Sequence, residues 1–352
     1  MATARFKTLL VALIVILAIV IAGVAYYTTT SQPSPTQTYP LPHWPKEIVV
    51  RAASVGTPSY IYMSMIAELI EENLGIKTTV QPGGAVANIA AVAEGEVDLA
   101  YINEFFIPLY MNPTLRERAG LEPVDLSKVA LIAGGVERRY CAVAAADDDV
   151  PANTFAELAE LVKQGYPLSI VMAGPPKTIE EYEYRALFAK YGVNFDELQI
   201  PMPGQAGGWS SFAEGKFNVV IDCQGVPTSA VKEAEARKTD IKPIMFSEED
   251  LDYLIEYFSP DALHKDVIPK GTYDFLKEDY PTVCAFTAIV VRSDMPKDLV
   301  YEITKLIAEH KDEIAKAVSA FVYDPNDAWK YGGGLSLHPG AEQYYVEAGY
   351  KK

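Results

Sequence analysis

The chain has 352 residues and a formal net charge of −17, with 30 Lys and Arg against 47 Asp and Glu. An acidic balance of this size argues against nucleic-acid binding, because phosphate contacts need clustered Lys and Arg. Hydrophobic residues make up 49% and charged residues 22%, which excludes an intrinsically disordered chain and predicts a packed core. At roughly 100 to 200 residues per domain, the length predicts two domains.

Cysteine and histidine are scarce. The 3 Cys, an odd number without a CxxC spacing, exclude a disulfide framework and a redox motif, and the 4 His stand singly along the chain. A zinc site is therefore not expected, and no metal or cofactor is predicted. Cys141 and Cys284 lie on two predicted strands; a bond between them stays open, but two independent buried thiols are favoured.

The N-terminal segment predicts a membrane address. Residues 9–27 carry no charge and follow Arg5 and Lys7. This run approaches the ~20 residues of a membrane-spanning helix and exceeds the ~7 to 15 of a signal-peptide core. Residues 1–27 are thus predicted to be a signal or anchor, uncleaved rather than cut after Ala25. The basic start places the rest outside the cytoplasm, at the cell surface or in the periplasm, or secreted after cleavage.

Residues 28–45 are rich in Thr, Ser and Pro and carry no charge before position 46. Such a composition is typical of an extended linker that cannot bury a core. The folded part is therefore predicted to begin near Lys46, tethered to the membrane by the helix that precedes the linker.

Strands and helices alternate beyond the linker. The patterns predict strands at 47–53, 76–81, 97–102, 129–134, 138–145, 167–172, 217–222 and 281–292. They predict helices at 58–73, 85–94, 155–164, 178–190, 227–238, 296–319 and 342–348, with capping boxes at Thr154 and Thr178. This order indicates an α/β fold with parallel sheets flanked by helices.

Two long strands, 138–145 and 281–292, bracket a complete α/β unit. A chain that leaves one lobe and returns to it needs two such crossover strands. We therefore expect lobe 1 to comprise residues 46–138 and 286–352, and lobe 2 to be an insertion of residues 139–285.

Four junctions between a strand and the next helix are rich in Gly or hydroxyl groups. Ligands in open parallel sheets bind beyond the carboxyl ends of the strands, where helix N-termini present free N–H groups. Candidate ligand-binding residues at these junctions and strand ends are Gly56, Thr57, Ser59, Tyr60, Gly83, Gly84, Ala85, Asn88, Asn103, Glu104, Gly174, Pro175, Lys177, Thr178, Gln224, Gly225 and Pro227.

Motifs of catalysis and nucleotide binding do not occur. The sequence holds no GxxxxGK[ST], GxGxxG, GxSxG or HExxH pattern. Glu104 and Asp222 stand near the predicted cleft as a conceivable acid and base, but a strand-end carboxylate more often orients a loop. No enzymatic activity is predicted.

Several segments resemble the TAXI-type solute receptors of TRAP transporters. They are VQPGGAVAN at 80–88, AEGEVDLA at 93–100, IPKGTY at 268–273, PTV at 281–283, VRSDMP at 291–296 and LHPGAEQYYVEAG at 337–349. The resemblance implies a type II periplasmic-binding-protein fold, with two lobes joined by two crossover strands. It also implies capture of a small carboxylate or amino acid, such as glutamate or 2-oxoglutarate, for an ion-gradient-driven permease.

Binding is expected to involve both lobes. A ligand carboxylate docks on the helix start at residues 83–85, completed by Thr57, Ser59 or Asn88, with Tyr60 or Trp209 packing on the ligand. Lobe 2 then closes through residues 177–178 and 224–225. Where the family commonly has Gly-Ser-Gly-Thr, this chain has Pro-Pro-Lys-Thr at 175–178, which removes two N–H donors and adds a cation. The alternatives are a ligand-sensing ectodomain and an anchored enzyme on the same fold.

Overall fold

The computed structural model describes residues 39–352, so the predicted signal or anchor and most of the linker lie outside the described residues. The chain from Pro42 to Lys352 forms one compact unit. Its order begins before the first strand, since Trp44 is buried and the His43 ring lies 2.8 Å from an Asp298 carboxylate oxygen. Within residues 39–352, no helix has the length and apolar character needed to cross a membrane.

The first sheet has five strands in the order β2-β1-β3-β11-β4. Their bounds are β1 Glu47–Arg51, β2 Lys77–Gln81, β3 Leu99–Asn103, β4 Val129–Gly134 and β11 Thr287–Arg292. The parallel pairing predicted for the first three strands is confirmed, since Val50 pairs with Val80 on one side and with Leu99 on the other. β11 returns from the far end of the sequence and runs antiparallel to both β3 and β4.

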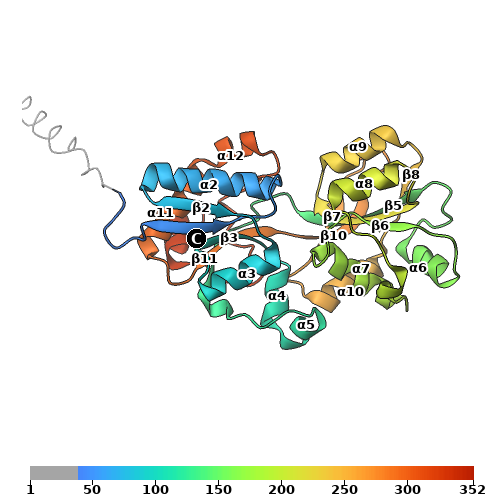
Figure 1. The fold of residues 1–352 in the computed structure, drawn as a ribbon, viewed down its shortest axis with the longest axis horizontal. Helices are drawn as coiled ribbons and strands as arrows, with labels where there is room; N and C mark the ends of the chain where they lie inside the picture. The colour runs from blue at the N-terminus through green and yellow to red at the C-terminus, as the bar shows by residue number, and fades with distance from the viewer. Residues whose placement is uncertain (1–38) are drawn as a thin grey trace, which may run out of the picture. The chain divides into compact units, whose positions relative to one another are not determined.

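Helices cover both faces of this sheet, with α2 on one side and α3 and α4 on the other (Figure 1). The helices of this part are α2 Pro58–Leu74, α3 Ala85–Glu94, α4 Phe106–Met111, α5 Pro113–Arg118, α11 Lys297–Glu309, α12 Lys311–Ala317 and α13 Pro339–Glu347, with the 3₁₀ turn η1 at Leu126–Lys128. Gly75 and Gly95 end α2 and α3 in the left-handed conformation that glycine adopts without steric cost.

The second sheet has six strands, in the order β6-β7-β5-β10-β9 with β8 paired to β5. Their bounds are β5 Tyr140–Asp147, β6 Ile170–Met172, β7 Val219–Gly225, β8 Ile241–Pro243, β9 His264–Ile268 and β10 Tyr280–Ala285. The accompanying helices are α6 Phe155–Lys163, α7 Ile179–Lys190, α8 Gln205–Ala213, α9 Ser229–Arg237 and α10 Glu248–Phe258, with η2 at Phe195–Leu198. Here the sheet is mixed, because β5 is antiparallel to β7 and β10.

We refer to the parts built on the first and second sheets as lobe 1 and lobe 2. Their exact boundaries remain the ones that we propose from the sequence. The chain passes between the sheets twice, from β4 to β5 and from β10 to β11. The single strand predicted at 281–292 is wrong, because it divides at Phe286. The N–H of Phe286 donates to the Glu104 carboxylate, at 3.0 Å, where the strand changes sheets. The helix predicted at 296–319 is also two helices, divided at His310.

Cys141 and Cys284 form a disulfide, so the prediction of two separate thiols is wrong. They lie directly opposite each other on β5 and β10, with Cα atoms 4.1 Å apart. The bond joins the two crossover strands at the edge of lobe 2. Cys223, the third cysteine, is free and buried on β7.

Candidate ligand-binding site

A cavity of about 1380 Å³ opens between the carboxyl ends of the strands of the two sheets. Loops that follow β1, β2 and β3 line it from lobe 1, and the loop that follows β6 lines it from lobe 2 together with α7. Strand ends of α/β sheets are the usual place for a ligand, and the volume exceeds the common range of roughly 300 to 1000 Å³. The cavity is therefore the candidate site.

Eight of the predicted residues meet in the lining of this cavity. They are Thr57, Gly83, Gly84, Ala85, Asn103, Pro175, Lys177 and Thr178. Five come from three separate loops of lobe 1 and three from one loop of lobe 2, so the fold brings distant parts of the sequence to one place.

The other predicted residues lie outside its lining. They are Gly56, Ser59, Tyr60, Asn88, Glu104, Gly174, Gln224 and Gly225, while Pro227 lines a separate cavity of about 410 Å³ beside the crossover segments. Trp209, expected to pack on the ligand, is instead fully buried, and its indole N–H donates to Asp222 over 2.6 Å. Cys223, which precedes Gln224, is fully buried as well.

Asn88 and Ser59 serve the structure of lobe 1. The Asn88 amide donates to the backbone oxygens of Ala52 and Tyr101, at 2.9 and 2.7 Å, which ties α3 to the strand ends. The Ser59 hydroxyl donates to the buried Glu137 carboxylate at 2.7 Å. Burial raises the pKa of Glu137 to about 7, against the hydrogen bond from Ser59. Asn88 Oδ1 has no hydrogen-bond partner among the described residues, but both side chains are buried and neither lines the cavity, so neither belongs to the proposed contacts.

Glu104 holds the crossover rather than the cavity. Its carboxylate accepts from the backbone N–H groups of Phe286 and Gly333, at 3.0 and 3.2 Å, and lies 3.2 Å from the His264 ring. The side chain is almost fully buried. This residue of lobe 1 therefore contacts a crossover segment and a strand of lobe 2 at once.

The N-terminus of α3 faces the cavity, and no side chain caps it. Gly84 is the N-cap, no side chain bonds the first turn, and no acidic residue lies in it. A Cβ built on Gly84 would meet no atom within 4 Å, so the space in front of the helix is open. By contrast, a Cβ on Gly83 would lie 2.2 Å from Asn88 Oδ1. The first N–H groups of a helix carry the positive end of its dipole, so this end suits an anion.

The opposite wall is the turn that precedes α7, and it differs from the predicted capping box. Thr178 does not cap the helix; its hydroxyl donates to the Pro175 oxygen at 2.7 Å. Glu181 accepts from the Lys177 N–H at 2.7 Å instead. Lys177 has φ +62, a left-handed conformation that is unusual for a residue with a side chain. The Thr154 capping box, in contrast, is confirmed by reciprocal bonds with Glu157.

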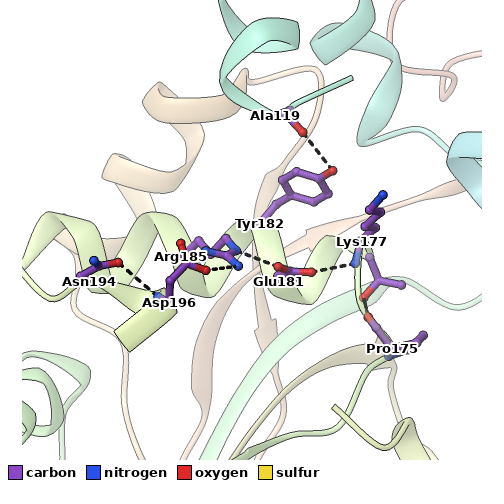
Figure 2. A network of polar contacts seen from close by, with 9 residues as sticks. Ala119, Pro175, Lys177, Glu181, Tyr182, Arg185, Asn194 and Asp196 are labelled. Atoms are coloured by element: carbon purple, nitrogen blue, oxygen red, sulfur yellow. Dashed lines mark hydrogen bonds and ion pairs between the residues drawn. The ribbon is translucent and has the colours of Figure 1, made fainter. Parts of the chain in front are cut away.

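Figure 2 shows Lys177 and Tyr182 extending from the same side of this turn and helix. The Lys177 ammonium group forms no ion pair within the described part of the chain. Tyr182 reaches the Ala119 oxygen of lobe 1 at 3.2 Å. Arg185, farther along α7, is occupied by Glu181 and Asp196 at 2.8 and 2.7 Å. Of the cations on this side of α7, Lys177 is thus the one available to an anion.

The match with a family model decides the identity of the chain. The model of the NMT1-like family covers residues 50–349, which is most of the sequence. The chain belongs to the NMT1-like family. The resemblance to TAXI-type substrate-binding proteins is thereby confirmed, and the protein is a solute-binding protein of the kind that serves periplasmic transporters.

Solved structures similar to this NMT1-like protein are remote in sequence. The periplasmic binding protein BugD shares 18% identity over 88% of this chain and 94% of its own, with a TM-score of 0.47. MatC from Rhodopseudomonas palustris with bound malate shares 13% over 88% and 98%, with a TM-score of 0.49. A histidine kinase sensor domain shares 13% over 80% and 99%, with a TM-score of 0.42. At these values the likenesses bear on neither ligand nor partner.

Among the side chains that sequence reasoning missed in the wall of this NMT1-like cavity, three are polar groups of β3, β5 and α7. Tyr101 and Tyr140 line it from β3 and from the start of β5, and Glu180 lines it from the first turn of α7. Burial raises the pKa of Glu180 to about 7. A Glu in the first turn of a helix normally faces solvent, so the sequence offered no signal that Glu180 is buried.

Proposed function

We propose that this protein is the extracytoplasmic receptor of a TRAP-type transporter, which captures a small carboxylate or amino acid between its lobes. The ligand carboxylate binds the N-terminus of α3 at residues 83–85, and Lys177 approaches it from lobe 2. Thr178 and Asn103 complete the polar surroundings. The liganded, closed form delivers the solute to an ion-gradient-driven permease, and no covalent step is involved.

The uncapped N-terminus of α3 is the observation that carries this proposal. Helix ends are usually satisfied by a Ser, Thr, Asp or Asn cap, and this one has a glycine that faces an open cavity. Charge-assisted hydrogen bonds contribute about 1.5 to 3 kcal/mol each. Three or four of them meet the roughly 8 kcal/mol of a micromolar receptor once association losses are subtracted.

Contacts between the lobes support closure as the mode of capture. Tyr182 of α7 packs on Phe105 and Phe106 of lobe 1, with ring centroids 6.1 and 5.7 Å apart. The Arg118 guanidinium lies 4.3 Å from the ring centroid of Tyr257 on α10. A ligand favours the closed form only through contacts that the open form lacks, and Lys177 on the facing wall supplies one.

The disulfide supports a location outside the cytoplasm, because such bonds persist in oxidising compartments. The predicted helix at residues 1–27 would hold the receptor at the membrane. Uptake into vesicles that contain the permease, with and without added receptor, tests the delivery step. Uptake that is equal without the receptor would contradict it.

Three substitutions at Gly84 test the carboxylate site. Gly84→Asp places a fixed carboxylate on the N–H groups of α3, and we expect it to weaken binding of carboxylates at least 100-fold. Gly84→Asn caps the same groups without a charge and is expected to weaken binding about tenfold. Gly84→Ala leaves the N–H groups free and has room for its Cβ, so its binding should stay within twofold.

A thermal-shift screen of amino acids and carboxylates identifies a ligand for these measurements, since a ligand at 100 times Kd stabilises by about 2.7 kcal/mol. Calorimetry on the three variants then gives their affinities. If Gly84→Asp retains micromolar binding, or if all three variants lose the same affinity, the ligand carboxylate does not bind at the N-terminus of α3.

A further inference from the structure

Glu180 places a buried acid in the wall of the cavity, opposite the end of α3. Its side chain lines the cavity, yet the residue is only 4% exposed. Its carboxylate packs against Gly174, where a Cβ would lie 2.9 Å from Oε1, and Oε2 has no hydrogen-bond partner among the described residues. A carboxylate oxygen that is buried and unpartnered beside an open cavity is suited to receive a donor from a ligand.

Three further polar side chains stand behind Glu180. Glu183 is on the same face of α7, and Asp222 and Gln224 are on β7; all three are fully buried. Asp222 Oδ1 and both polar atoms of Gln224 lack hydrogen-bond partners in the described part of the chain. No ion pair of the described residues includes Glu180, Glu183 or Asp222. These three carboxyl groups therefore have no cationic partner among the described residues.

Two tyrosine rings line the same cavity as Glu180. Tyr101 belongs to β3 of lobe 1, and Tyr140 is the first residue of β5 in lobe 2. Burial, and then the charges of Glu137 and Glu180, raise the pKa of Tyr101. A carboxylate with tyrosine rings nearby is a common receptor for ammonium groups, because the ring faces also attract a cation.

Resting on the proposed function, we propose that Glu180 binds a positively charged group of the ligand, so that the transported solute carries an ammonium group as well as a carboxylate. The carboxylate lies at the end of α3 and beside Lys177, and the ammonium lies at Glu180, in the cavity that Tyr101 and Tyr140 also line. A second carboxylate of a dicarboxylate would instead face the Glu180 carboxylate, which disfavours such solutes.

Isosteric ligand pairs test this assignment, because each pair differs only by a positive charge. The probes are L-glutamate and 2-methylglutarate, L-leucine and 2,4-dimethylpentanoate, γ-aminobutyrate and pentanoate, and glycine betaine and 3,3-dimethylbutanoate. The affinities are measured by calorimetry at pH 8, where Glu180 is ionised. The other titratable groups near Glu180 are Glu183, Asp222, Cys223, Tyr101 and Lys177. In the pair that binds best, the member with the ammonium group should bind at least 30-fold more tightly than its carbon analogue.

Glu180→Gln removes the charge and keeps the shape of the side chain. It should weaken binding of the ammonium-bearing member at least tenfold and leave the affinity for the carbon analogue within twofold. Glu68→Gln is the matched control for binding, since Glu68 is exposed on α2 and does not line the cavity. This control should change neither affinity, and thermal unfolding verifies that both variants fold.

The outcomes separate this inference from the proposed function. If the carbon analogues bind as tightly as the ammonium-bearing ligands, the proposed ammonium site is wrong and the proposed carboxylate site stands. Equal losses of both members in Glu180→Gln overturn it as well. Absence of binding by every probe overturns both proposals, and the Gly84 variants then show no ligand-dependent difference.

Discussion

The two walls of the cavity are built in different ways. The lobe 1 wall presents backbone N–H groups and small residues, with Gly83, Gly84 and Ala85 at the start of α3. The lobe 2 wall presents charged side chains, Lys177 at the turn and Glu180 in the first turn of α7. One wall therefore provides a fixed dipole, and the other provides charges that can differ between related proteins without a change of fold.

This difference assigns separate roles to the walls. In the proposed function, the helix terminus of lobe 1 is the general site for a carboxylate, because backbone N–H groups do not depend on side-chain identity. Side chains on a short turn can be exchanged singly, so we propose that lobe 2 selects among carboxylates. Three measurements, from the largest expected effect to the smallest, test this comparison.

The largest effect is expected from Glu180 in the ligand-free protein. Burial raises its pKa from 4.5 to about 7, so the folded state holds a proton that the unfolded state has lost between these values. Its contribution to stability is therefore complete below pH 4.5 and is lost as the pH rises to about 7. At pH 8, Glu180→Gln should be more stable than the unmodified protein by about 3 kcal/mol, at 1.36 kcal/mol per pKa unit.

Urea unfolding at pH 4 and pH 8 measures this, and the two proteins should differ little at pH 4. Glu94→Gln, which changes an exposed carboxylate at the end of α3, should show no such dependence of stability on pH. A stability difference of the same size at both pH values would mean that Glu180 is not buried as an acid.

A smaller loss is expected in the lobe 1 wall. A Cβ on Gly83 would lie 2.2 Å from Asn88 Oδ1 and 2.7 Å from Arg51 Cγ, so Gly83→Ala displaces the Asn88 amide from its two backbone acceptors. We expect it to cost about 2 kcal/mol. Gly84→Ala, one residue later, has open space and should cost almost nothing. Urea unfolding compares them, and equal stabilities would show that the wall is not closely packed.

The smallest effect is expected from Lys177, whose ammonium group lies at an exposed turn. Lys177→Ala should weaken L-glutamate about fivefold, near 1 kcal/mol, and L-glutamine less. The loss should shrink with added salt, because the site is open to solvent. Calorimetry with both amino acids measures it, with Lys163→Ala on α6 as the control. Equal losses for the two ligands would exclude a role for Lys177 in selecting acidic solutes.

Elements with strong local patterns were predictable from the sequence. α3 and β4 have the predicted bounds, because Gly95 stops α3 and an uninterrupted apolar run marks β4. α10 was missed although Ser247 and Asp250 form a capping box, which is a signal that the sequence contains. α4 and α5 were missed because Pro108 and Pro113 interrupt a short segment that reads as a loop.

The candidate site was predictable at its loop residues, including Lys177 and Thr178, but not at its buried side chains. A glycine-rich turn before a helix announces an open N-terminus, and residues 83–85 do line the cavity. The sequence does not reveal that Asn88 and Ser59 are occupied by internal hydrogen bonds, since those partners lie 13 to 78 positions away along the chain. The same holds for Glu180, which is buried by its packing against Gly174 and the strands of lobe 2.

By itself the sequence determined the α/β class and the family, because these follow from local periodicity and from short motifs. Only the tertiary structure decided which polar groups face the cavity and that Cys141 bonds Cys284. The reason is physical: burial and strand register depend on residues that are distant in the chain, and a charge or thiol has no local pattern that reports its surroundings.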